Sequence, residues 1–299
     1  MYNLLFEIIM SNECNKRCSY CKLDFFDKKI SNNNLDFLNN FLNHYSENIW
    51  SCIINFFWGE PLLNYEWIQY FVEKTKHLKF VKYSIWTNWI LLSEEILDYF
   101  IKNNFTISLS LDSWNTDLLL QNKYLLKGKK NIQINYIINP KTIEKSFIDF
   151  DKIIDFWFKN INIMPVYFTI KWSKETYVLL KKIVETKIKK YIWKNWYKIN
   201  FFSYYNWVST DIQYILDTDW YVYSDLDSLL WIQKQWWVIS TELKHKITKL
   251  TKIDKIESIT LENLISWYNV KEIIRLVNDI PKEQWFLKDY KILDKIFNG

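Results

Sequence analysis

Three cysteines near the N-terminus have the spacing of a metal-cluster site. Cys14, Cys18 and Cys21 form a C-x3-C-x2-C pattern within eight residues. Three thiolates on one loop can hold three irons of a [4Fe–4S] cube and leave the fourth iron open for chemistry, whereas a cluster that only carries electrons usually takes four cysteines. A zinc knuckle and three unrelated thiols are the alternative interpretations of this pattern.

Short apolar runs alternate with amphipathic segments along the first two thirds of the chain. The runs predict strands at Leu4–Met10, Ile53–Phe57, Phe80–Ile85, Phe105–Leu111, Ile132–Ile138 and Ile161–Phe168. Helices are expected at Ser31–Tyr45, at 65–78, from Ser93 onward, and in a lysine-rich segment that ends near Ile192. Strands that alternate with helices at this pitch indicate βαβ units and a parallel sheet.

Polar motifs stand where several of these strands end. Trp58-Gly59-Glu60-Pro61 follows the second strand, Thr87-Asn88-Trp89 follows the third, and Ser108-Leu109-Ser110-Leu111-Asp112 closes the fourth. In barrels of parallel strands the active site lies at the carboxyl ends of the strands. The positions of these motifs therefore agree with a site at that end, beside the cysteines.

The cysteine spacing, with Tyr20 just before the third cysteine and the later motifs in this order, resembles the radical S-adenosylmethionine (radical SAM) superfamily. Trp58-Gly59-Glu60-Pro61 resembles the GGEP motif of that family if residue 58 is glycine, and Thr87-Asn88-Trp89 resembles its T-N-G. The resemblance implies an α/β fold, a partial (β/α)6 barrel with a small α+β C-terminal extension, and a core domain over residues 1–192.

The resemblance also implies two cofactors and their ligands. Cys14, Cys18 and Cys21 would hold a [4Fe–4S] cluster, with no catalytic residue assigned beyond it. S-adenosylmethionine would be bound by Tyr20, Trp58, Gly59, Glu60, Pro61, Thr87, Asn88, Ser110, Asp112 and Asn135. The implied activity, that of an oxidoreductase or transferase, is reductive cleavage of S-adenosylmethionine followed by abstraction of a substrate hydrogen.

Residues 193–299 show a different pattern. Asp217-Thr218-Asp219-Trp220-Tyr221-Val222-Tyr223-Ser224 predicts a hairpin and resembles the start of the auxiliary-cluster (SPASM or twitch) domain of peptide-modifying family members. Ser224 stands in place of the cysteine, and no cysteine follows Cys52, so thiolates cannot hold a second cluster here. This resemblance implies a degenerate substrate-holding region and a peptide or protein substrate; an unrelated hairpin is the alternative.

Two other functions remain open on the sequence. A glycyl-radical-enzyme activase is one, although the S-L-D at the fourth strand end differs from the D-x-K of that group. A zinc-held binding module without catalysis is the other, and it would need Cys52 or His44 as a fourth ligand. The three histidines show no catalytic pattern. Besides the peptide or protein substrate, the expected partner is an electron donor such as flavodoxin or ferredoxin.

Composition limits the remaining classes. No apolar run of about 18 residues and no signal-peptide pattern occurs, so we expect no membrane partner. Four cysteines, three of them clustered, favour a reducing cytoplasm over a disulfide framework. The net charge of +5 is a mild excess of 39 basic over 34 acidic residues, so the charge does not favour a nucleic-acid partner.

The glycine and tryptophan contents are abnormal. The chain has 3 glycines and 17 tryptophans, whereas average usage predicts roughly 21 glycines at this length. Several tryptophans follow asparagine or aspartate, as in Asn88-Trp89 and Asp219-Trp220, where turns favour glycine. We infer that most of these positions are glycine in the native protein, encoded by UGA codons that the source organism reads as glycine.

Overall fold

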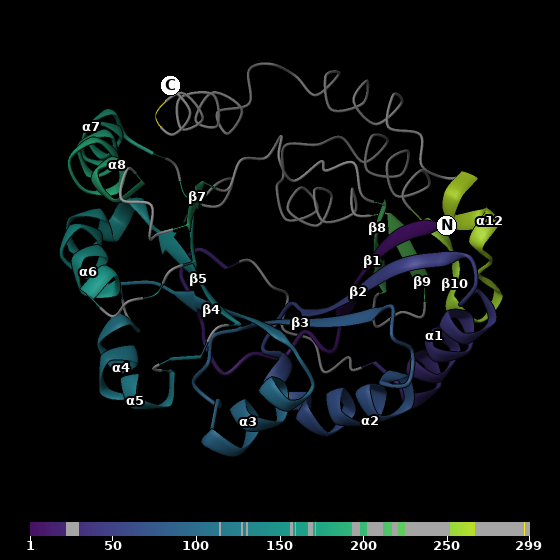
Figure 1. The fold of residues 1–299 in the computed structure, drawn as a ribbon. Coiled ribbons are helices and arrows are strands. Elements are labelled where there is room, and N and C mark those ends of the chain that lie inside the picture. The colour runs from purple at the N-terminus through teal and green to yellow at the C-terminus, as the bar shows by residue number, and fades with distance from the viewer. Residues whose placement is uncertain are drawn as a thin grey trace.

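The computed structural model describes residues 1–21, 30–113, 115–126, 128–129, 131–155, 158, 160–166, 170, 172–192, 198–201, 212–216, 221–224, 252–266 and 296, and the elements below lie within them (Figure 1). The strands are β1 (Tyr2–Ile9), β2 (Ile49–Phe57), β3 (Val81–Thr87), β4 (Thr106–Leu111), β5 (Ile132–Ile138), β6 (Asn160–Pro165), β7 (Lys198–Phe201), β8 (Ile212–Leu216), β9 (Tyr221–Ser224) and β10 (Lys252–Lys255). The helices are α1 (Asn32–His44), α2 (Tyr65–Thr75), α3 (Glu94–Lys102), α4 (Thr116–Gln121), α5 (Lys123–Leu126), α6 (Ile143–Asp155), α7 (Lys174–Ile183), α8 (Lys189–Ile192) and α12 (Leu261–Ser266).

Six parallel strands form a curved sheet with helices along its convex face (Figure 1). Strands β1 to β6 pair in chain order, each parallel to the next. Helices connect them, as right-handed crossovers of parallel strands require. The predicted α/β class and partial (β/α)6 barrel are confirmed, and all six predicted strands are present. The sixth is shorter than predicted: it ends at Pro165, and residues 167–168 lie outside the described part.

Strands from the C-terminal third extend the same sheet at both edges. The sheet order is β10-β9-β8-β1-β2-β3-β4-β5-β6-β7. β7 pairs parallel with β6, and β8 pairs parallel with β1. β8 and β9 are antiparallel, with Tyr214 opposite Ser224, so the strand pair of the hairpin predicted before Ser224 is confirmed. Residues 217–220, where its turn was expected, lie outside the described part of the chain. The division of the chain at residue 192 stays a prediction.

The helices begin at capping residues and bury one face against the sheet. Ser31 accepts a hydrogen bond from the backbone N–H of Asn34 at the start of α1, and Ser93 accepts one from Ile96 at the start of α3. Alternate strand residues such as Phe6 and Phe56 point into this helix-side core, where both are fully buried. The helices therefore stabilise the sheet from one side and leave its strand ends to form a site.

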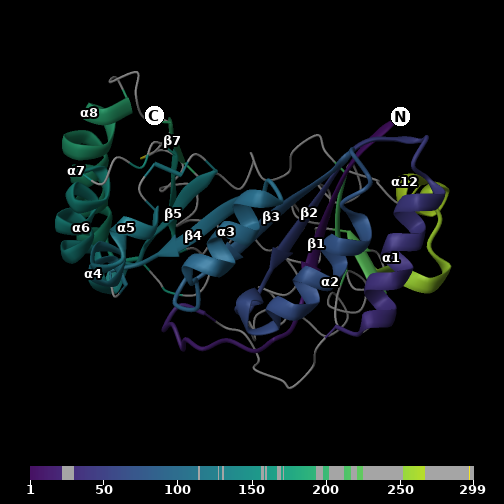
Figure 2. The ribbon, with the colours of Figure 1, turned by 60° about the horizontal axis from the view of Figure 1, so that its bottom comes forward.

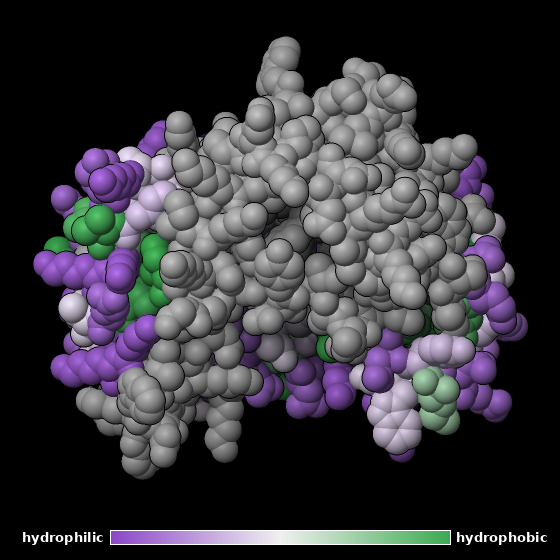
Figure 3. All heavy atoms as spheres, turned by 90° about the horizontal axis from the view of Figure 1, so that it is seen from above, coloured by the Kyte–Doolittle hydropathy of each residue, from purple (hydrophilic) through white to green (hydrophobic). Residues whose placement is uncertain are grey.

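Three segments show features that the sequence did not reveal. The lysine-rich segment contains a π-helical turn, Val184–Ile188, between α7 and α8. The short helices α4 and α5 lie between β4 and β5, and α6 lies between β5 and β6; no helix was predicted in either place. Among the described residues no helix is long and apolar enough to cross a membrane. Seen from above, the described residues are visible mainly at the left and right sides of the molecule (Figure 3). Their residues are mostly hydrophilic, with a few apolar ones between them.

Candidate functional site

The loop after β1 carries the three clustered cysteines. All three are partly exposed, and in Figure 2 this purple loop runs below the neighbouring strands. The backbone N–H of Lys16 donates to the Cys14 sulfur at 3.4 Å, and the side-chain amide of Asn88 approaches the same sulfur at 3.7 Å. The N–H of Cys21 donates to the carbonyl of Cys18 at 2.9 Å. The loop is therefore held by hydrogen bonds to the Cys14 sulfur and by the backbone bond between Cys21 and Cys18.

The turn after β2 packs directly against this loop. The backbone N–H of Glu60 donates to the carbonyl of Glu13 at 2.8 Å. Gly59 has a φ of +59°, and a Cβ on it would lie 2.3 Å from the carbonyl oxygen of Glu13 and 2.7 Å from that of Ser11. No side chain fits there, because non-bonded carbon and oxygen atoms cannot approach so closely. Gly59 is thus required for the contact between the turn and the cysteine loop.

Glu60 joins the ends of β2 and β3. Its carboxylate is fully buried and accepts three hydrogen bonds: from the Thr87 hydroxyl at 2.7 Å, the Asn88 N–H at 2.7 Å and the Leu62 N–H at 3.1 Å. Burial raises the pKa of this carboxyl, while the bonds from Thr87 and Asn88 act in the opposite direction. These bonds fix the backbone of the third strand end, from which Asn88 reaches the loop at Cys14.

The end of β4 contacts the loop through Asp112. Its Oδ2 accepts a hydrogen bond from the Tyr20 hydroxyl at 3.0 Å and lies 3.3 Å from the Lys16 ammonium. Its Oδ1 accepts from the Asn115 N–H at 3.2 Å. Burial, and after it the charge of Asp112, raises the pKa of Tyr20, so this phenol stays protonated and donates.

The end of β5 reaches the loop at a different residue from the one predicted. Asn139, which follows β5, places its side-chain amide 3.5 Å from the Ser19 hydroxyl. Asn135 lies earlier on the strand, opposite Ser110 of β4, and accepts a hydrogen bond from Asn162 at 2.8 Å. Ser110 and Asn135 thus form a neighbouring pair within the sheet, while the described contacts of the loop involve the residues after the strands.

The structure therefore brings most of the predicted site residues together. Those that contact the loop, or brace a residue that does, are Tyr20, Gly59, Glu60, Thr87, Asn88 and Asp112; Trp58 and Pro61 adjoin them in the β2 turn. The sequence reading missed Lys16 and Asn139. Lys16 lies inside the cysteine motif, so its charge was a visible signal, whereas Asn139 is marked only by the Asn-Pro pair that ends a strand.

The loop suits a thiolate-bound cluster. Backbone and amide N–H groups directed at a cysteine sulfur stabilise thiolate and tune cluster potentials. Burial raises the pKa of the Cys14 thiol, and the Lys16 N–H and the Asn88 amide oppose that rise. Among the described residues, no three His, Cys, Asp or Glu side chains converge as a single metal ion would need. Three thiols are the donors that a [4Fe–4S] cube with one open iron takes.

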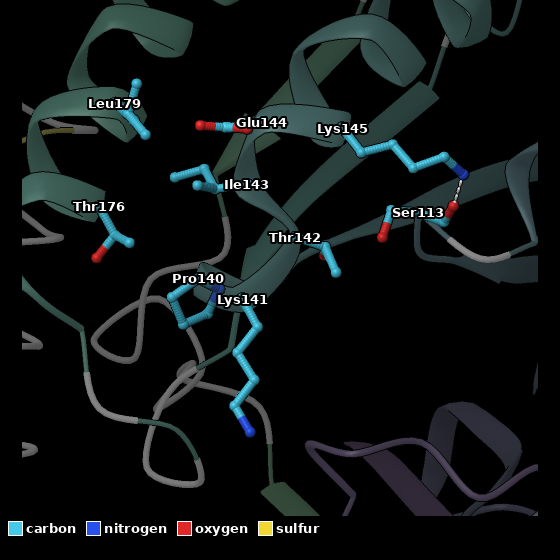
Figure 4. A pocket seen from close by; sticks show the side chains of 9 residues that line it. All are labelled: Ser113, Pro140, Lys141, Thr142, Ile143, Glu144, Lys145, Thr176 and Leu179. Atoms are coloured by element: carbon cyan, nitrogen blue, oxygen red, sulfur yellow. Dashed lines mark hydrogen bonds between the residues drawn. The ribbon is translucent and has the colours of Figure 1, made fainter.

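A cavity lies beside the ends of β4 and β5. Its volume is about 480 Å³, and it lies between the start of α6 and the helix α7 (Figure 4). Leu179 and Thr176 of α7 border one side, and Lys145 on the other side extends toward the carbonyl of Ser113, to which it donates a hydrogen bond. Ser113 follows Asp112 directly, so the cavity adjoins the residues that contact the cysteine loop.

A parallel half-barrel whose carboxyl strand ends hold a three-cysteine loop defines a class of cluster-dependent enzymes. Residues 8–144 match the family model described as the radical SAM superfamily, which is the family that the sequence motifs resemble.

Two curated relatives share part of the chain. The radical SAM cyclopropyl synthase TigE of Paramaledivibacter caminithermalis is 27% identical over 192 residues, which are 54% of this chain and 40% of TigE. A cysteine-type anaerobic sulfatase-maturating enzyme of Clostridium novyi is 28% identical over 225 residues, 63% of this chain and 58% of that enzyme. The chain thus spans about half the length of these curated relatives.

Solved structures share the fold. The structure named native anSMEcpe with bound AdoMet and Cp18Cys peptide has a TM-score of 0.69 at 15% identity, covering 99% of this chain and 97% of that chain. Streptococcus suis SuiB bound to its precursor peptide SuiA has a TM-score of 0.53 at 18% identity, covering 74% and 59%. At these identities the likeness shows the fold alone.

Proposed function

We propose that this protein is a radical SAM enzyme that modifies a peptide or protein. The observation that carries the proposal is the cysteine loop, which the ends of β2, β3, β4 and β5 all contact. Cys14, Cys18 and Cys21 would hold the [4Fe–4S] cluster. When bound, the cluster supplies the electron that cleaves S-adenosylmethionine, and the resulting 5′-deoxyadenosyl radical removes a substrate hydrogen.

The residues of this chain position the reactants. Gly59 and the backbone around it would receive the methionine end of S-adenosylmethionine beside the thiols, because that turn touches the loop. Asp112 would accept hydrogen bonds from the ribose, since its Oδ1 is fixed by the turn at Asn115 and its Oδ2 faces the loop. Tyr20 would pack near the adenine. Thr87 and Glu60 act indirectly, by fixing the third strand end.

The substrate class rests on similarity and on the cavity. Both solved structures above contain a peptide by their names, and TigE and the sulfatase-maturating enzyme belong to the same superfamily. The cavity between α6 and α7 has room for peptide side chains within reach of the strand ends. A flavodoxin or ferredoxin in the cytoplasm would supply the electron.

Anaerobic reconstitution tests the proposal. Protein loaded with iron and sulfide, reduced with dithionite and mixed with S-adenosylmethionine should release 5′-deoxyadenosine and methionine in equal amounts. Omission of the reductant is the control and should yield neither product. Absence of 5′-deoxyadenosine from protein that carries four irons per chain would contradict the proposal.

A further inference from the structure

Lys16 is a cation placed among the acidic residues of the site. It lies between Cys14 and Cys18, and its ammonium is 3.3 Å from Asp112 Oδ2. Its side chain is 17% exposed, so the charge is largely removed from bulk water. Burial raises the pKa of the Glu60 carboxyl, and the charge of Lys16 acts in the opposite direction. The ammonium therefore pairs with an acidic residue at the end of β4, and its charge also acts on the buried one at the end of β2.

Asp112 binds the Lys16 ammonium and leaves some of the ammonium's N–H donors unused. The turn fixes Asp112: its N–H donates to Asn115 Oδ1 at 2.8 Å, and the Thr116 hydroxyl donates to its carbonyl at 3.0 Å. A lysine ammonium has three donors, and in the described part of the chain its one hydrogen-bond partner is Asp112 Oδ2. Within the described structure, two donors of Lys16 thus remain for a ligand.

The neighbouring cation is engaged elsewhere. Arg17 donates from Nη1 to the carbonyl of Cys14 at 2.5 Å and to that of Lys16 at 3.0 Å. Its guanidinium thus braces the backbone of the loop. Among residues 11–21 of the loop, which the structure describes, Lys16 is therefore the cation that pairs with a strand end.

A zwitterionic amino acid matches this arrangement of charges. S-adenosylmethionine carries an ammonium, a sulfonium and a carboxylate, and the site offers acidic oxygens together with the Lys16 ammonium. Charge-assisted hydrogen bonds to a carboxylate are about twice as strong as neutral ones. Resting on the proposed function, we propose that Lys16 binds the carboxylate of S-adenosylmethionine and selects for it. A structural ion pair that only clamps the loop to β4 is the alternative.

Binding of two compounds by the reconstituted protein separates these roles. The probes are S-adenosylmethionine and its decarboxylated analogue, S-adenosyl-3-methylthiopropylamine, with dissociation constants measured anaerobically by equilibrium dialysis. Lys16→Met should weaken binding of S-adenosylmethionine about 10- to 100-fold, as expected for a hydrogen bond to a charged group. It should change binding of the analogue by less than about twofold, because the analogue has no carboxylate for Lys16 to bind.

Two further variants control the measurement. Lys16→Arg keeps the charge and should keep the preference for S-adenosylmethionine. Lys79→Met removes an exposed lysine just before β3, at the amino end of the strands, and should bind both compounds as the wild type does. The iron content of each variant shows whether its cysteine loop still forms. If Lys16→Met loads less iron than the wild type, the test is repeated with Lys16→Gln, which retains a hydrogen-bond donor for Asp112.

The outcomes distinguish this inference from the proposed function. If Lys16→Met weakens the binding of both compounds equally, or leaves the preference for S-adenosylmethionine unchanged, the role of Lys16 is overturned. The proposed function still stands in that case, provided that the wild-type protein binds S-adenosylmethionine. Wild-type protein that carries the cluster and binds neither compound would overturn both.

Discussion

Single thiols decide whether this loop can hold a cluster. Cys18 is the central cysteine of the three, and its carbonyl accepts the hydrogen bond that closes the loop to Cys21. Cys18→Ala should abolish iron loading and cleavage of S-adenosylmethionine, because a cube held by two thiolates loses a second iron site. Iron analysis after desalting and assay of 5′-deoxyadenosine measure both effects.

Cys52 is the matched control for that variant. It lies in the helix-side core, fully buried, and burial alone raises the pKa of its thiol. Cys52→Ala should leave iron loading unchanged and lower the free energy of unfolding by about 1–2 kcal/mol, because it leaves a small cavity. Unchanged turnover in Cys18→Ala would refute the cluster assignment.

Two tryptophans have backbone conformations that suit glycine. Trp58 has a φ of +72° and Trp89 a φ of +57°, a region that costs residues with a side chain roughly 1–2 kcal/mol. Hydrogen bonds of the turn impose this conformation at Trp89, whose N–H donates to the Thr87 hydroxyl at 2.9 Å. The indole N–H of Trp89 is buried without a hydrogen-bond partner in the described structure, which adds a further cost.

We therefore predict that residues 58 and 89 are glycine in the native protein and that the gene carries UGA at both. Sequencing of the gene tests this directly, and UGG codons at both positions would contradict the prediction. Trp58→Gly should also strengthen binding of S-adenosylmethionine, because an indole next to Gly59 restricts access to that backbone. Equal affinity of the two proteins in equilibrium dialysis would mean that residue 58 lies outside the binding site. Trp114 and Trp220, to which the same inference was applied, lie outside the described residues.

Residue types were predictable from the sequence, whereas their partners were not. The contact between Lys16 and Asp112 joins positions 96 apart, and that between Ser19 and Asn139 joins positions 120 apart. A lysine or an asparagine has no local pattern that identifies such a partner. The sequence motifs therefore located the site, and the fold was needed to show which side chains meet in it.

At the scale of elements, the strands were predictable because each is rich in apolar residues, and alternate residues are buried, as Val81, Tyr83 and Ile85 are in β3. The order and pairing of β1 to β6 followed from their alternation with helices. The additions of β7 to β6 and of β8 to β1 were not predictable, because the partner of an edge strand is set by tertiary packing. The helix α4 was missed because a segment of six residues is too short to show a helical period.

Glu60 provides a test of how strand ends are held together. Glutamine at this position keeps one acceptor oxygen but places an amide N–H₂ against the N–H of Asn88 or of Leu62. Glu60→Gln should therefore lower the free energy of unfolding by about 1–3 kcal/mol, the cost of an unsatisfied buried donor. Urea denaturation of the cluster-free protein measures it.

The control is Glu66→Gln, which alters an exposed carboxylate at the start of α2. Its effect should stay within about 0.5 kcal/mol. Similar effects of the two substitutions would show that the buried hydrogen bonds of Glu60 contribute little to the joining of β2 and β3.

At the scale of the whole molecule, the cavity between α6 and α7 offers a test of substrate binding. Leu179 borders it, whereas its neighbour Val178 is 63% exposed. Leu179→Trp should fill part of the cavity and weaken, by tenfold or more, the binding of peptides selected on the wild-type protein from a random library. Val178→Trp is the control and should bind them as the wild type does. Peptides that bind all three proteins equally would place the substrate elsewhere.

The number of clusters is a property of the entire chain. Three of the four cysteines lie in the loop after β1, the fourth is in the core, and no cysteine follows Cys52. Because the core thiol is fully buried, three thiolates remain, enough for one cube with an open iron. Reconstituted protein should therefore hold about four irons and four sulfides per chain after desalting. Eight irons per chain would show that ligands other than cysteine, or a partner subunit, hold a second cluster, and one zinc per chain with no sulfide would favour the binding module over the enzyme.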